Sequence, residues 1–339
     1  MKASMTASAS LSAQQLFQHK VDSLIDAAQT CFQQISKKYF VFHLAFALLV
    51  FCEVILALFF FAPLIDSYFI GIAIALIFFT LLLYFILRLY YNEQKPEELT
   101  LLCDEFVKAC KDFALFNENT PDHYLSVASS CYRMTDHLQK SVPQFYTVPK
   151  QLHFLAPLID KYGFQFHLDD LHKMKELFLL AAIDEHLRLI KSMPTSLDAH
   201  AACANAYMTL SSHYVDCKNS KKIRSTRKLQ ELVRRQRHTA QRALEEFKIL
   251  NEYAPSDPWV HEQLAVSFRN LQMPKEEIQA YETILQLDPH DFEAVYQLGL
   301  CYFKQGDIGK GLKMYEKLKA ADAEKAAELI QHYGNFAIH

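Results

Sequence analysis

The sequence predicts an all-α protein in which a transmembrane helical hairpin is followed by a C-terminal α-solenoid of short helical repeats. Three observations lead to this fold class. Glycine is rare, with seven residues in a chain of 339, and strand-like alternation between turn residues is hard to find. Two long apolar runs lie close together near the N-terminus. A 34-residue period marks the C-terminal part, and such periods are typical of helical repeat arrays.

The N-terminal 38 residues divide into two parts. Residues 1–12 are rich in Ser, Thr and Ala and lack apolar periodicity, so we expect them to be disordered. Residues 13–38 are predicted to form an amphipathic helix, because apolar side chains recur there at alternating spacings of four and three. This helix either packs against the membrane surface or the domain downstream of the membrane, or joins two copies of the protein. Its stripe consists of Phe17, Val21, Leu24, Ala28, Cys31 and Ile35.

Residues 39–91 predict the transmembrane hairpin. Two apolar runs, about 40–62 and 68–90, are each long enough for a helix to cross a bilayer at about 1.5 Å per residue. Hydrophobicity continues around both helices, whereas a helix in a globular core normally keeps a polar stripe. A secretory signal peptide does not fit, because the first run starts about forty residues into the chain. Tyrosines occur where membrane interfaces are expected: Tyr39, Tyr68, Tyr90 and Tyr91.

Basic residues predict the orientation of this hairpin. Lys37 and Lys38 precede the first span, Arg88 and Lys95 occur at the end of the second, and the connecting turn carries only Asp66. The positive-inside bias places both termini on the cytoplasmic side, so we expect an integral membrane protein with two spans. The eight cysteines form no CxxC pair, which fits reduced thiols in that compartment.

Glu53 is an acidic residue near the middle of the first span. A charged group at this depth costs a few kcal/mol, so such residues are usually paired, protonated or functional. One interpretation is a protonated carboxyl that hydrogen bonds to Tyr84 or Thr80 of the second span. The alternative is a contact between copies in a homo-oligomer, since two helices alone cannot enclose a transport pathway.

The 34-residue period resembles the tetratricopeptide repeat. That family places a large–small pair at positions seven and eight of each unit, an aromatic residue at eleven and a bulky residue at twenty-four. The resemblance implies two units, 258–291 and 292–322, followed by a cap helix and tail in residues 323–339. The matching residues are Leu264, Ala265, Phe268 and Tyr281 in the first unit, and Leu298, Gly299, Tyr302 and Tyr315 in the second.

Weaker signals extend the resemblance upstream, so the repeat region is predicted to span 181–322. Ala204 matches the small position of a first helix and Ala243 matches a position of a second helix, but too many residues separate the two. This unit is therefore predicted to carry a basic insertion at about 212–238. Residues 92–180 are predicted to be helical, either as degenerate repeats or without a repeat pattern.

The resemblance also implies a function. Tetratricopeptide repeats stack into a right-handed solenoid whose first helices line a concave groove for a peptide or partner protein. The alternative is that the residues at these positions pack against a neighbouring helix or the N-terminal segment. Clamping of a C-terminal carboxylate is not expected, because only Asn205 matches the Lys, Asn and Arg set that such proteins use. The candidate partner-binding residues are Trp259, Glu262, Val266, Arg269, Tyr296, Leu300 and Phe303.

The predicted insertion is strongly basic. Between residues 218 and 242 there are ten Lys or Arg and one acid, Glu231. The simplest interpretation is a solvated face on a long helical hairpin, and the alternatives are contact with anionic lipid or with an acidic protein. Nucleic acid is not an expected partner, because no aromatic residues are interleaved to stack on bases. The candidate basic patch comprises Lys221, Lys222, Arg224, Arg227, Lys228, Arg234, Arg235 and Arg237.

Catalysis has little support in the sequence. It contains no HExxH motif, glycine-rich phosphate loop or GxSxG motif, and its fifteen histidines are scattered without metal-ligand spacing. We therefore expect no catalytic residues, no metal and no cofactor.

Together these patterns favour a membrane-anchored, non-enzymatic scaffold that recruits a partner protein through the repeat groove. The expected partners are a protein or peptide ligand, the lipid bilayer and a second copy of the chain. One alternative is a structural or assembly subunit of a membrane complex. Another is a secreted effector facing a host cytosol, because a closely spaced hairpin with both ends on one side resembles the inclusion-membrane proteins of chlamydiae.

Overall fold

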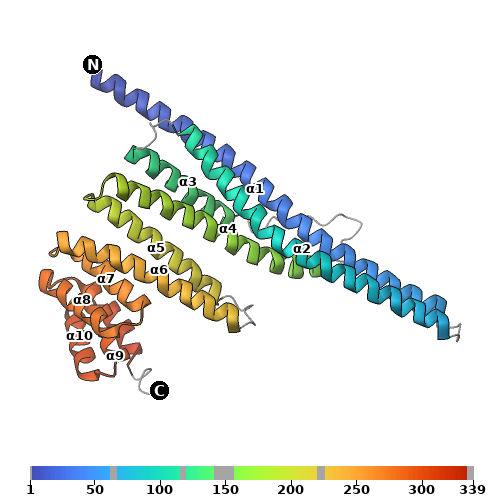
Figure 1. Cartoon of the computed structure of the whole chain (residues 1–339). Coiled ribbons are helices and arrows are strands. Elements are labelled where there is room, and N and C mark those ends of the chain that lie inside the picture. The colour runs from blue at the N-terminus through green and yellow to red at the C-terminus, as the bar shows by residue number, and fades with distance from the viewer. Residues whose placement is uncertain (1, 62–66, 115–119, 141–155, 220–225, 334–339) are drawn as a thin grey trace. The chain divides into compact units, whose positions relative to one another are not determined.

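The computed structural model describes residues 2–61, 67–114, 120–140, 156–219 and 226–333, with side chains placed outside 2–16, 60–61, 67–70 and 156–167. Within these ranges the regular structure is entirely helical, as the sequence predicts. The chain divides into two compact units, Met1–Ala182 and Ile183–His339. Figure 1 shows the course of the chain from the long N-terminal helices to the short C-terminal ones.

Two long helices dominate the first unit (Figure 1). Helix α1 covers Lys2–Leu56 and continues into a π-helical turn, η1 (Ala57–Phe61), while α2 covers Ser67–Phe113 and packs alongside α1. The predicted amphipathic helix and the first span are thus one continuous helix, because no glycine or proline interrupts residues 2–61. The predicted turn around Asp66 lies outside the described residues.

The start of α1 differs from the expectation. The sequence pattern predicts disorder for residues 1–12, whereas α1 begins at Lys2. Alanine and methionine are good helix formers, and extending an existing helix by one residue costs far less than starting a new one. The helix that is packed from Phe17 onward therefore continues towards the N-terminus.

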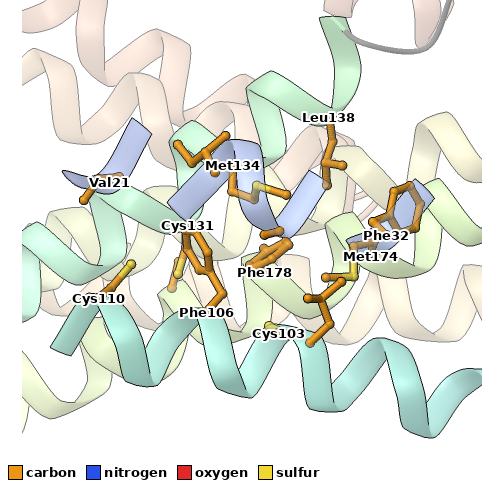
Figure 2. Close-up of a cluster of buried hydrophobic side chains, with 14 of the residues drawn as sticks. Val21, Phe32, Cys103, Phe106, Cys110, Cys131, Met134, Leu138, Met174 and Phe178 are labelled. Carbon is orange, nitrogen blue, oxygen red and sulfur yellow. The ribbon is translucent and has the colours of Figure 1, made fainter. Parts of the chain in front are cut away.

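Outside the apolar runs, α1 and α2 form a hydrophobic core with α3 (Pro121–Lys140) and α4 (Ala156–Ser192). Figure 2 shows side chains from these helices meeting in this core, where the rings of Phe106 and Phe178 pack edge to face at 5.2 Å. The α1 side chains in this core pack against helices downstream of the apolar runs, which is one of the predicted alternatives for this helix. The labelled residues are Val21, Phe32, Cys103, Phe106, Cys110, Cys131, Met134, Leu138, Met174 and Phe178.

The buried stripe of α1 has a different register from the predicted one. Cys31 is exposed, and Leu24 and Ile35 are only partly buried. The observed spacings are four, four, three, four and four, which follow an eleven-residue repeat of about 3.67 residues per turn instead of about 3.5. A straight helix drifts by about 20° per heptad, so a strict heptad stripe leaves the core after a few turns. The buried positions are Phe17, Val21, Ile25, Ala28, Phe32 and Ser36.

The second unit contains two helix pairs related by the predicted period. The first pair is α7 (Pro258–Asn270) with α8 (Pro274–Leu287), and the second is α9 (Phe292–Lys304) with α10 (Ile308–Ala321). Each helix of the second pair begins and ends 34 residues after its counterpart. The predicted tetratricopeptide-like pairs are therefore confirmed, and they are followed by one more short helix, α11 (Ala323–Gln331).

Local signals repeat with the same period. Asp257 and Asp291, 34 residues apart, cap α7 and α9 by accepting hydrogen bonds from backbone N–H groups. At the turn between the two helices of a pair, Gly306 has a φ of 77°, and Gln272, 34 positions earlier, has a φ of 59°. A left-handed backbone suits glycine, whereas a glutamine there costs about 1 kcal/mol. The left-handed turn is thus formed at both positions, although the glutamine side chain disfavours it at Gln272.

Hydrophobic cores connect each helix pair to the next. One core joins the pair that precedes α7 to α7 itself, a second joins α7 and α8 to α9, and a third joins α9 and α10 to α11. The helices approach closely at the predicted small positions. Ala265 is fully buried, and a Cβ atom at Gly299 would lie 2.7 Å from Leu329 Cδ2. Stacking of this kind buries apolar faces that a single repeat cannot bury alone.

The predicted insertion lengthens one helix pair. Helices α5 (Leu197–Asn219) and α6 (Thr226–Tyr253) have 23 and 28 residues, compared with 13 and 14 in α7 and α8. Ala204 and Ala243 are both buried in the core that α6 shares with α7, as their assignment to one unit predicts. The basic segment therefore extends a helical hairpin, which agrees with the simplest sequence interpretation.

We predict that Phe32→Ala destabilises the first unit strongly and that Cys31→Ala does not. Phe32 is 0 % exposed, and truncating a buried phenylalanine costs about 3–5 kcal/mol. Its neighbour Cys31 is exposed, so truncation there changes the free energy of unfolding by less than about 0.5 kcal/mol. Thermal unfolding of the detergent-solubilised protein measures both changes. A larger loss for the Cys31 variant would show that the heptad register is the correct one.

Candidate functional sites

The apolar runs of α1 and α2 form an exposed surface, which we call the apolar sleeve (residues 41–59 and 72–89). Both helices are long and apolar enough to cross a membrane, by length and composition. In their most apolar stretches none of α1 and 6 % of α2 is buried, whereas the core helix of a soluble protein is mostly buried. Large exposed side chains of the sleeve include Phe51, Phe59, Phe78, Phe85 and Leu89.

Two polar contacts join the helices inside the sleeve. Thr80 Oγ1 donates a hydrogen bond to Glu53 Oε1 at 2.7 Å, and His43 Nδ1 lies 3.1 Å from Tyr84 Oη. The predicted bond between Glu53 and Thr80 is therefore present, while Tyr84 pairs with a histidine that the sequence analysis did not assign. The second carboxyl oxygen of Glu53 is enclosed and has no hydrogen-bond partner among the described residues. The hydrogen bond within the hairpin is therefore present, and the contact between copies stays a prediction.

Ion pairs mark the end of the sleeve nearest the four-helix core. Lys38 Nζ lies 2.7 Å from Glu98 Oε1, and Lys95 Nζ lies 2.6 Å from Asp170 Oδ1. The ammonium groups of Lys38 and Lys95 lie 5.5 and 5.1 Å from the centre of the Tyr39 ring. These contacts connect α1, α2 and α4. We call the group the collar, and it consists of Ser36, Lys38, Tyr39, Lys95, Glu98 and Asp170.

Asp170 is the buried acid of the collar. Burial raises the pKa of its carboxyl, while the adjacent Lys95 ammonium and a hydrogen bond from Ser36 Oγ at 3.2 Å oppose that rise. The carboxylate is thus partnered from two helices, which is the condition under which a charge is tolerated inside a protein. Lysine and tyrosine have an apolar body and a polar tip, so both are typical of a membrane–water interface.

Four of the predicted partner-binding residues are accessible. Trp259 is 39 % exposed on α7, and Glu262 is exposed one turn further along the same helix. Val266 on α7 and Leu300 on α9 are partly exposed. The accessible part of the predicted groove therefore lies mainly on α7.

Two of the predicted residues are not accessible. Tyr296 and Phe303 are buried in the core that α9 shares with α10 and α11. The ring of Phe303 packs edge to face against Tyr333 at 5.9 Å, and Leu329 of α11 is fully buried in the same core. Their assignment to an open groove is therefore corrected, because α11 packs on the face of α9 that the repeat resemblance assigns to a partner.

Arg269 is held by its own chain. Its Nε donates a hydrogen bond to Glu277 Oε1 at 2.7 Å, and Nη2 donates to Tyr281 Oη and Gln297 Oε1, both at 2.8 Å. Burial by itself would lower the pKa of Arg269, but the hydrogen bond and charge of Glu277 raise it overall. The guanidinium group therefore connects α7, α8 and α9 instead of facing a ligand.

Arg269 and Glu277 occupy positions twelve and twenty of the first unit, and the second unit has a different pair of residues at these positions. Phe303 and Gly311 follow Arg269 and Glu277 by 34 residues, and the Phe303 ring occupies the space that a Cβ at Gly311 would need. A large side chain at position twelve therefore packs over position twenty in both units, once as an ion pair and once as a ring over glycine. This pairing was visible in the sequence as a coupled change, Arg with Glu and Phe with Gly, but the sequence analysis did not use it.

A cavity of about 270 Å³ lies beside the Arg269 network. Cys301 Sγ donates a hydrogen bond to Glu277 Oε1 at 3.2 Å, and burial raises the pKa of this thiol to about 12. Such a thiol stays protonated at neutral pH and is a poor nucleophile. The cavity is lined by Arg269, Gln272, Pro274, Glu277, Cys301, Lys304 and Gln305.

The described part of the basic patch lies on α6. Arg227, Arg234 and Arg237 are exposed, and Arg235 forms a two-point contact with Glu231 at 2.6 and 3.1 Å. Lys228 belongs to the same exposed stretch. The other three candidates, Lys221, Lys222 and Arg224, lie outside the described residues.

No family model and no curated protein matches the chain. Solved structures that resemble it include MamA (residue 41 to the end) from Desulfovibrio magneticus RS-1, with 14% identity, 72% coverage of this chain, 94% of that chain and a TM-score of 0.37. YrrB, titled a TPR protein with an unusual peptide-binding site, has 13% identity, coverages of 63% and 94% and a TM-score of 0.34. The P58(IPK) TPR domain has 12% identity, coverages of 94% and 98% and a TM-score of 0.25.

These similarities are low, so the class of fold rests on this chain's own geometry. The 34-residue offset of the helix pairs, the matching caps and the shared cores define an all-helical protein with tetratricopeptide-like repeats.

We predict strong coupling between Arg269→Phe and Glu277→Gly. Arg269→Phe leaves the buried Glu277 carboxylate without its partner, which costs about 3 kcal/mol, and Glu277→Gly leaves the half-buried Arg269 unpaired at a smaller cost. Together they recreate the arrangement of Phe303 over Gly311, so the double variant should unfold within about 1.5 kcal/mol of the unmodified protein. Denaturant unfolding of all four proteins gives the coupling energy. Additive losses would contradict the equivalence of the two pairs.

Proposed function

We propose that the protein is a non-enzymatic scaffold, anchored in a membrane by its helical hairpin, that recruits a partner protein through its repeats. The observation that carries this proposal is the apolar sleeve, which begins on both helices where the collar ends. Exposed apolar patches of soluble monomers rarely exceed a few hundred square ångströms, so a sleeve around two helices calls for a lipid environment. The polar contacts inside it lie between the helices, as in a hairpin surrounded by lipid.

Charge supports a membrane orientation with both ends of the chain on the cytoplasmic side. Lys37, Lys38 and Lys95 lie at or beside the collar, and Arg88 is exposed at the same end of the sleeve. Positively charged residues near the ends of spans are retained on the cytoplasmic side. The four-helix core and the repeats would then both face the cytoplasm.

The accessible face of α7 is the proposed contact for a partner. Trp259 and Glu262 are exposed one turn apart, with Val266 partly exposed one turn further on. Tryptophan is enriched among the residues that dominate binding energy, and a mixed apolar and acidic surface suits a peptide that carries both apolar and basic side chains. Partner recruitment is therefore proposed for this face and not for Tyr296, Phe303 or Arg269.

The anchor is tested by replacing the hairpin with a loop. Lys38 and Glu98 lie in contact, so a short Gly/Ser linker from residue 38 to residue 94 can close the four-helix core without the sleeve. We expect the full chain to remain in the membrane pellet after alkaline carbonate extraction and the linked variant to be released in folded form. A fragment that starts at residue 92 serves as the contrast, because it lacks the buried α1 side chains and should be unstable. Release of the full chain by carbonate would contradict membrane anchoring.

The recruiting face is tested by photo-crosslinking in cells. A photoreactive amino acid at Glu262 should yield a discrete adduct with a partner, and Trp259→Ala should reduce that adduct several-fold in a protein that remains folded. Gln279 is the matched control, because it is exposed on α8, the other helix of the same pair. Equal adducts from both positions would contradict a specific contact with α7.

A further inference from the structure

The α5–α6 pair is much longer than the repeat pairs that follow it. Its helices have 23 and 28 residues against 13 and 14, which makes them longer by roughly 15–20 Å at about 1.5 Å per residue. The α6 side chains that pack in the core with α7 begin at Ala240. The first part of α6, residues 226–238, lies beyond that core, and we call it the arm.

Positive charge is concentrated at the arm. Residues 218–242, which include the arm, carry ten Lys or Arg and one acid, and five of the ten lie in the arm, whereas the rest of the chain carries 25 basic and 37 acidic residues. The net charge of −3 hides this separation. Within the arm, Arg227, Arg234 and Arg237 are exposed and form no ion pair with a carboxylate in the described part of the chain. Their charge is therefore available to an external anion.

Apolar side chains lie next to these arginines. Leu229 is 36 % exposed and Val233 is 41 % exposed, and Leu229, Val233 and Arg237 follow one another at intervals of four residues, which places the three along one strip of the helix. Arg227 and Arg234, seven residues apart, share a second strip. The arm thus offers two apolar side chains beside long, flexible cationic ones.

This combination favours a bilayer surface over the other anionic partners. A single-stranded nucleic acid would be expected to meet aromatic side chains that stack on bases, and the arm has none, while a duplex offers phosphates but no apolar layer for Leu229 and Val233. An acidic protein segment would neutralise the arginines but provides no apolar layer for Leu229 and Val233. An anionic bilayer provides both, because apolar side chains enter the interface while guanidinium groups reach lipid phosphates.

We propose that the arm docks on the anionic surface of the membrane that holds the hairpin. The inference rests on the proposed function, because the hairpin is what brings the arm to a bilayer. Docking would give the second unit its own contact with the membrane and so restrict how the repeats present Trp259 to a partner. Each basic side chain near an anionic surface is worth about 1 kcal/mol, so three of them change the docking equilibrium by roughly a hundredfold.

The test uses the full chain reconstituted in vesicles of phosphatidylcholine brominated in its acyl chains, with or without phosphatidylserine. Trp259 is the single tryptophan, so Trp259→Phe gives a protein without tryptophan fluorescence. In that background Val233→Trp reports contact of the arm with the bilayer, because brominated chains quench a tryptophan that touches them. Tyr253→Trp is the matched control, since Tyr253 is exposed at the far end of the same helix.

We expect quenching of the Val233→Trp protein in vesicles that contain phosphatidylserine, little in neutral vesicles, and none for the control in either. High salt should abolish the quenching, since the screening length falls to about 3 Å at 1 M. Adding Arg227→Gln, Arg234→Gln and Arg237→Gln should weaken docking by roughly a hundredfold.

Two results would overturn the inference alone. One is a protein that floats with the vesicles while its Val233→Trp emission is unquenched in the presence of phosphatidylserine. The other is quenching that survives the three arginine substitutions. A protein that does not float with vesicles at all would instead overturn the membrane anchor, and the docking inference with it.

Discussion

The first unit depends on one buried core, in which side chains that precede the apolar sleeve pack against side chains that follow it. Phe32 of α1 belongs to the same core as Phe106 of α2 and Phe178 of α4. Because α1 and α2 run without interruption from this core into the sleeve, the register set in the core also determines which residues of the two helices meet further along. The opposition of Glu53 and Thr80 is a consequence of that register. The apolar sleeve and the four-helix core therefore belong to one structural unit.

Periodic features of the fold could be predicted from the sequence, because they depend on local spacing. The 34-residue offset, the small residues at Ala265 and Gly299 and the lengthened α5–α6 pair all follow from residues that repeat at fixed distances. The register of α1 could not be predicted in this way. Heptad and eleven-residue stripes share Phe17, Val21 and Ala28, and the partner helices decide between positions 24 and 25, 31 and 32, and 35 and 36.

The candidate site was predictable only in part, for a similar reason. Position in a repeat predicts the helix and the face on which a residue lies, but not whether another part of the chain covers that face. Arg269 and Phe303 occupy equivalent positions, and each is occupied by a contact with position twenty of its own unit. Trp259 and Glu262 keep exposed surface, although the ring of Phe247 on α6 packs against Trp259. Long-range packing, which leaves no periodic trace in one sequence, decides between these outcomes.

The positive charge of the arm lies at positions that helix packing leaves exposed. Side chains of the stacked repeats are limited by neighbouring helices, whereas residues 226–238 lie beyond the core that α6 shares with α7, and their exposed positions could carry any polar side chain. Arg227 and Arg234 nevertheless share one strip of that surface, and like charges on one helix face repel each other and reduce helix stability. Only one acid, Glu231, offsets this repulsion within the arm, and it is engaged by Arg235. The repulsion between these basic side chains thus lowers the stability of the isolated arm. An anionic bilayer would neutralise the charges and remove the repulsion.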